Sequence, residues 1–167
     1  MGLRIYYRTV APDELRRFER GPEDYHPFFI GLIGDGNAAP GTQLCLEKSY
    51  RFLLLLLDAE GEYERTEWHD LAPRTAAGRA IVGAHALGLS YLSDHDLVPR
   101  YVRPEEVPAA ADALATADLT GALADRGPDL TAAGWRVGPW LAEPLGRLLA
   151  LYERARADGD GVVVQLW

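Results

Sequence analysis

The sequence predicts an α+β fold, a helix-rich single domain in which strands near both termini pack on two long amphipathic helices. Leu3–Val10 indicates the first strand, because apolar and polar side chains alternate there with period two. Val162–Trp167 is mainly β-branched or aromatic and indicates another strand. Between them, Leu44–Asp58 and Leu141–Ala157 repeat apolar residues at the helical period. A length of 167 residues suits one domain, which we place over 1–167.

The helix predicted over Leu44–Asp58 is the element around which the core should form. Its apolar stripe consists of Leu46, Tyr50, Leu53, Leu54 and Leu57. Every residue from 52 to 57 is apolar, so the second half of the helix needs cover on several sides. The run is shorter than the ~20 apolar residues that cross a membrane. It therefore predicts a buried core helix and no membrane span.

Shorter elements are predicted before this helix. Pro12 suits a first helical position, Leu15 and Phe18 give the helix an inward face, and Gly21 ends it. Gly34–Gly41 has the composition of a loop. Its glycines lack the spacing of known phosphate-binding motifs, so a simple turn is favoured.

The chain between the two long helices alternates polar and apolar segments. Ala59–Gly78 is polar and long for a structureless connection, so it is either a functional loop or contains a short hairpin. Apolar character returns over Ala80–Ser93. Pro104 then opens a helix with two acids near its positive dipole end. Asp118–Leu123 predicts a short helix, and the glycines and prolines of Gly127–Pro139 predict turns.

The charge balance limits the classes of partner. With 25 acidic and 17 basic residues, the chain has a formal net charge of −8. That balance disfavours nucleic acid, because phosphate binding depends on clustered Lys and Arg. It suits solubility, and it would attract a basic protein partner. A single cysteine and an N-terminus without an apolar signal segment predict a cytoplasmic protein.

Four segments resemble the YfbM-like proteins, a bacterial family classified only as a domain of unknown function. They read LEKSYRFLLLLLDA, RAIVGAH, PRYVRPEEV and LYERARADGDGVVVQLW, and they span roughly residue 44 to the end. Leu54 stands where the family helix often has histidine, and Arg103 stands where a capping serine is usual. The resemblance implies an α+β bacterial domain and supplies no reaction.

Three residues near the middle of the chain are candidates for chemistry. His85 suits a general base, although a hydrogen-bonded structural histidine is favoured. Arg100 offers a planar fork for a carboxylate or phosphate, and Tyr101 adds a polar tip to an apolar body. An internal acid is favoured as the partner of Arg100.

The donor types for a divalent metal also occur. Asp94 and Asp96 would converge on one face of a strand, and His69 would have to come from the polar loop. No recognised zinc spacing is present, so neither a metal nor another cofactor is predicted. Cys45 reads as a small buried hydrophobe, because no basic neighbour in the sequence would lower the pKa of its thiol.

These observations leave three functional hypotheses. The favoured one is a non-catalytic binding protein, of an immunity or regulatory kind, that presents acidic groups to a basic protein partner. The second is a small hydrolase or transferase with one pocket around His85, Arg100 and Tyr101. The third is a small-molecule sensor, which requires a sizeable apolar pocket with a few convergent polar groups. The oligomeric state does not follow from the sequence.

Overall fold

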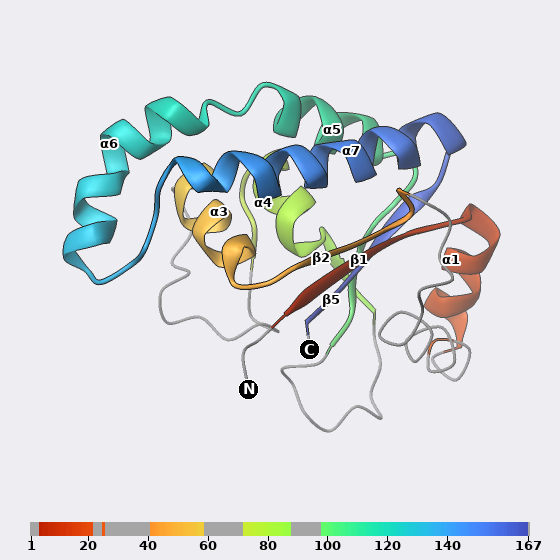
Figure 1. The fold of residues 1–167 in the computed structure, drawn as a ribbon. Helices are drawn as coiled ribbons and strands as arrows, with labels where there is room; N and C mark the ends of the chain where they lie inside the picture. Colours follow the sequence, from red (N-terminus) through yellow and green to blue (C-terminus); the bar gives the residue numbers. More distant parts are fainter. Residues whose placement is uncertain (1–3, 22–24, 26–40, 59–71, 88–97, 167) are drawn as a thin grey trace.

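The computed structural model describes residues 4–21, 25, 41–58, 72–87 and 98–166 (Figure 1). The five strands form one antiparallel sheet in the order β2-β1-β5-β4-β3. They are β1 (Ile5–Val10), β2 (Gln43–Leu46), β3 (His85–Ala86), β4 (Arg100–Val102) and β5 (Gly161–Leu166). The strands from the two ends of the chain are neighbours in the sheet, as β1 and β5. The α+β fold predicted from the sequence is confirmed.

Helices cover the sheet unequally. They are α1 (Pro12–Arg20), α3 (Ser49–Leu57), α4 (Ala76–Val82), α5 (Val107–Ala115), α6 (Leu119–Ala132), the short 3-10 helix η4 (Pro139–Leu141) and α7 (Ala142–Asp158). Figure 1 shows α3 to α7 gathered on one side of the sheet, with α1 set apart at its end. None of these described helices is long and apolar enough to cross a membrane.

Alternation along β5 divides the apolar residues into two clusters. Val162 and Val164 belong to the main core, to which α3, α4, α5 and α7 contribute most of the helical residues. Val163 points the other way and packs in a smaller cluster with Phe18 of α1 and with Tyr101 of β4. Both faces of β5 are therefore buried, and all six of its residues are inaccessible or nearly so.

The central helix is shorter than predicted. Its buried residues Tyr50 and Leu53 to Leu56 form the core as expected, but the helix begins at Ser49 rather than Leu44. Residues 43–46 instead form β2, in which Leu44 and Leu46 are the buried positions. A buried residue at every second position fits a strand, and pairing with β1 satisfies its backbone groups. The helical spacing of Leu46 from Tyr50 was coincidental.

Other boundaries also differ from the predictions. Residues 104–106 form a turn, so α5 begins at Val107 rather than at the predicted Pro104. Pro108 is tolerated in the first turn of α5, because the amides of a first turn have no acceptor within the helix. In contrast to the predicted turns, α6 continues through Gly127 and Pro128 to Ala132. In β1 both Tyr6 and Tyr7 are buried, so the strand has two covered faces rather than one.

Three side chains satisfy carbonyl groups at the end of α4. Tyr7 donates to the carbonyl of Ile81 at 2.7 Å, and Tyr152 donates to that of Ala80 at 2.8 Å. Burial raises the pKa of both phenols, which keeps them protonated as donors. The guanidinium of Arg100 donates to the carbonyl of Gly83 from Nε and Nη2, both at 3.2 Å. These bonds fix α4 against the sheet and α7, because the last carbonyls of a helix have no partner within it.

Candidate functional site

The sheet register places His85 and Tyr101 side by side. They are directly opposed partners in the antiparallel pair β3–β4, and their ring centroids are 5.2 Å apart. Arg100 is the next residue on β4 and therefore faces the other side of the sheet. It is buried there against Gly83, and its guanidinium donates to the backbone carbonyl of that residue. The structure thus brings together two of the three predicted residues and separates the third.

Five polar side chains from α1, β3, β4 and the turn before α5 form a polar cluster. Its members are Glu19, His85, Tyr101, Arg103 and Glu106. The Tyr101 hydroxyl donates to Glu19 Oε1 at 2.6 Å, and the Arg103 guanidinium contacts the same oxygen at 3.4 Å. Burial, and then the bond to Glu19, raise the pKa of Tyr101. The phenol is therefore a hydrogen-bond donor here rather than a base.

Glu106 links His85 to the turn that precedes α5. His85 Nε2 lies 2.8 Å from Glu106 Oε2 and 3.0 Å from Oε1. An ionised carboxylate only accepts, so Nε2 carries a proton and donates. Glu106 Oε2 also accepts from the backbone amide of Arg103 at 3.1 Å. The spacing is that of one half of a capping box, but here the bond closes the turn of residues 104–106 and the N-cap of α5 is Glu106 itself.

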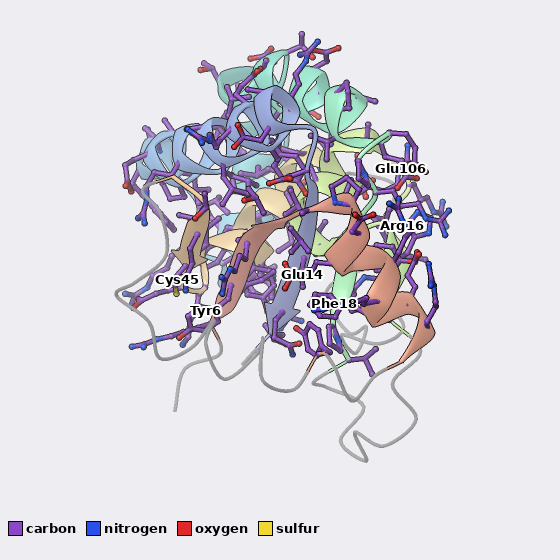
Figure 2. The ribbon with its side chains drawn as sticks, turned by 90° about the vertical axis from the view of Figure 1, so that its right-hand side faces the viewer. Tyr6, Glu14, Arg16, Phe18, Cys45 and Glu106 are labelled. Atoms are coloured by element: carbon purple, nitrogen blue, oxygen red, sulfur yellow. The ribbon has the colours of Figure 1, made fainter. Side chains whose placement is uncertain are left out.

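A nucleophile for His85 is not found among the described residues. Cys45 lies on β2 at one edge of the sheet, whereas His85 lies on β3 at the other. Figure 2 shows Cys45 and Tyr6 together on one side of the molecule and Glu106 on the opposite side. Burial raises the pKa of the Cys45 thiol, which keeps it in its less nucleophilic form. Among the described residues, the contacts of His85 therefore join β3 to β4 and to the turn before α5.

A cavity of about 220 Å³ lies beside Glu106, between α4, β4 and α5. We call it the α4–α5 pocket, and it is lined by Ala76, Arg79, Ala84, Val102, Glu105, Glu106, Ala109 and Ala110. Small apolar side chains form most of its wall. Two carboxylates and one guanidinium supply the charge, so the lining has one net negative charge. Within the described residues Glu105 has no hydrogen-bond or ion-pair partner, and the Arg79 guanidinium donates to the carbonyl of Arg74 at 3.2 Å.

The acidic charge of the chain is unevenly distributed along the sequence. Residues 22–24, 26–40, 59–71 and 88–97 contain ten of the 25 acidic residues and one of the 17 basic residues. The part that the structure describes therefore contains nearly equal numbers of both. The net negative charge of the chain therefore comes mainly from residues outside the described ranges.

The metal candidates Asp94, Asp96 and His69 lie outside the described residues. Within residues 4–21, 25, 41–58, 72–87 and 98–166, no group of three or more His, Cys, Asp or Glu side chains is placed to hold a metal ion. From the sequence, Glu106 was expected only to interact with the positive end of a helix dipole, and Glu19 was not singled out. The spacing from Arg103 to Glu106 was an available signal, but no local pattern points from Glu19 to Tyr101.

Comparison with known proteins places the chain among proteins without an assigned activity. Residues 1–131 match a family model described as Domain of unknown function (DUF1877). No curated protein matches the sequence. The fold is similar to the crystal structure of YfbM from Escherichia coli, a protein of unknown function, with a TM-score of 0.69 and 17% identity over 98% of this chain and 99% of that chain. The predicted YfbM-like resemblance is confirmed, and the family match also includes the N-terminal region, which the resemblance did not cover.

Proposed function

This chain belongs to the DUF1877 family of domains of unknown function, and we propose that it is a non-catalytic binding protein that holds a basic side chain of a protein partner in the α4–α5 pocket. The observation that carries this proposal is the combination of two carboxylates with a small apolar cavity. A lysine or arginine side chain has the matching chemistry, because its apolar stem lies along apolar surface while its charged end reaches an acid.

The charges of the pocket favour one cation. Glu105 is exposed and has no partner in the described part of the chain, so its carboxylate can pair without breaking an existing contact. Glu106 is held in place by His85 and by the Arg103 amide. Arg79 on the opposite wall compensates one of the two acids. A single positive charge therefore brings the lining to neutrality, and a second would be repelled.

The polar cluster supports a binding role more than a catalytic one. Its hydrogen bonds point from one structural element to the next, and they hold Tyr101 as a donor to Glu19. They also fix the position of Glu106 at the pocket wall. A preorganised carboxylate loses little side-chain freedom on binding, which favours affinity.

A titration by NMR tests this proposal with a defined probe. Adding N-acetyl-lysine methylamide to ¹⁵N-labelled protein should shift the amide signals of Ala84, Ala109 and Ala110, while the neutral N-acetyl-glutamine methylamide should not. Glu105→Gln should weaken binding of the probe by up to about fivefold, since an exposed ion pair contributes at most about 1 kcal/mol. Glu143→Gln removes the same charge from an exposed position on α7 and is the matched control. Equal responses to both probes, or equal losses in both variants, would contradict the proposal.

A further inference from the structure

A second concave site lies between α6 and the segment that leads into α7, and it shares no residue with the polar cluster or the α4–α5 pocket. It is a groove of about 640 Å³. Its lining consists of Leu119, Thr120, Leu123, Ala124, Gly127, Pro128, Thr131, Val137, Gly138, Pro139 and Ala142. None of these side chains carries a charge. The volume falls within the ~300–1,000 Å³ typical of small-molecule sites, which are likewise mostly apolar.

The groove has unused hydrogen-bonding capacity at defined places. Pro128 lies inside α6 and has no backbone N–H, so the carbonyl of Ala124 lacks its usual helical donor. Ala124 itself lines the groove. The hydroxyls of Thr120 and Thr131 have no hydrogen-bond partner among the described residues. One acceptor and two hydroxyls are therefore available in an otherwise apolar wall.

We propose that this groove binds an uncharged, mostly apolar small molecule that carries a hydrogen-bond donor. The donor satisfies the Ala124 carbonyl, and the apolar part replaces water along Leu123, Pro128 and Val137. A charged ligand is disfavoured, because no lining group would replace the hydration of its charge. This site is separate from the α4–α5 pocket and makes the protein responsive to a small molecule as well as to a basic partner.

The probe N-phenyl-1-naphthylamine has the required chemistry, with two apolar ring systems, one N–H donor and no charge. We expect its fluorescence to rise on addition of the protein and to saturate at one molecule per chain. The related 8-anilino-1-naphthalenesulfonate has the same rings with an added negative charge, and it should bind at least tenfold more weakly. Equal affinity for the two probes would overturn the assignment of an uncharged ligand.

Matched variants locate the binding. Ala142→Trp fills the groove from α7, and Ala150→Trp places the same side chain at another exposed position of α7 that does not line it. Only the first should abolish the signal, and Ala124→Trp from the opposite wall should reproduce that loss. Circular dichroism identifies any variant that fails to fold. Retained binding of the probe in both groove variants would overturn the proposal. It would also be overturned if the parent chain self-associated and Ala142→Trp made it monomeric, because the groove would then hold a second copy of the chain.

Discussion

Replacing Gly83 by alanine should strongly destabilise the protein, because the site combines an unusual backbone conformation with a close approach of two elements. Gly83 follows α4 with φ +82° and ψ 142°, a region that is almost confined to glycine. A Cβ atom there would lie 2.6 Å from the Cβ of Arg100 and 2.9 Å from the backbone nitrogen of Tyr101. Neither neighbour is the flexible end of a side chain, so β4 itself would have to move.

The expected cost follows from these two contributions. Holding a non-glycine residue in such a conformation costs about 1–3 kcal/mol. Forcing an extra carbon into a packed contact costs a further 1–3 kcal/mol or so. The displaced strand also weakens the bonds from Arg100 to the Gly83 carbonyl. We expect the free energy of unfolding to fall by about 4 kcal/mol, a large share of the roughly 5–15 kcal/mol that stabilises a typical domain.

Urea unfolding followed by far-UV circular dichroism measures this loss. Gly159→Ala is the control, since Gly159 has φ +72° in the left-handed region but no heavy atom within 4 Å of an added Cβ. It should lose only about 1 kcal/mol, from strain alone. If Gly83→Ala lost no more than Gly159→Ala, the contact between residue 83 and β4 would not be as close as the structure has it.

Three further outcomes are expected. Asp58→Ala should lower the free energy of unfolding by about 3 kcal/mol, because this fully buried carboxylate accepts hydrogen bonds from the backbone amides of Arg74 at 2.9 Å and Thr75 at 3.2 Å. An unchanged urea midpoint would contradict its role at the start of α4. Tyr101→Phe should lose about 1 kcal/mol in the same assay through its bond to Glu19, and a gain in stability would argue against that bond. Burial raises the pKa of the Cys45 thiol, so its labelling by a disulfide reagent at pH 8 should be slower than that of a free cysteine and should accelerate at higher pH. A labelling rate that is already maximal at pH 8 would refute this.

The parts of the fold that the sequence predicted are those with a local periodic signal. The strands at the two ends and the helices now seen as α1 and α7 have such signals and were placed to within a few residues. The start of the central helix was wrong because Leu46 lies both four residues before Tyr50, as in a helix, and two residues after Leu44, as in a strand. Tertiary pairing with β1 decided between them. Likewise, Pro128 suggested a turn, but α6 packs well enough on α3 to retain a proline in its interior.

The candidate site was predicted less completely, because its contacts join residues far apart in the sequence. His85 and Tyr101 were named from residue type, and only the register of β3 against β4 shows that they meet. Strand alternation in β4 separates Arg100 from Tyr101, and because no strand was predicted at residues 100–102, the sequence did not show that all three residues could not share one pocket. Glu19 is 82 residues from Tyr101, a distance that no local pattern spans.

The segments RAIVGAH and PRYVRPEEV, which supported the family resemblance separately, meet in the structure. The Gly83 carbonyl of the first segment accepts a hydrogen bond from the Arg100 guanidinium of the second, and the His85 ring is hydrogen-bonded to the Glu106 carboxylate. Packing and hydrogen bonding between the two segments give each of these four residues a structural role. Functional tests should therefore concentrate on a group that this packing leaves unused. Glu105 is such a group, since it lines the α4–α5 pocket and has no partner among the described residues, and its replacement by glutamine tests the proposed binding without removing a contact of the fold.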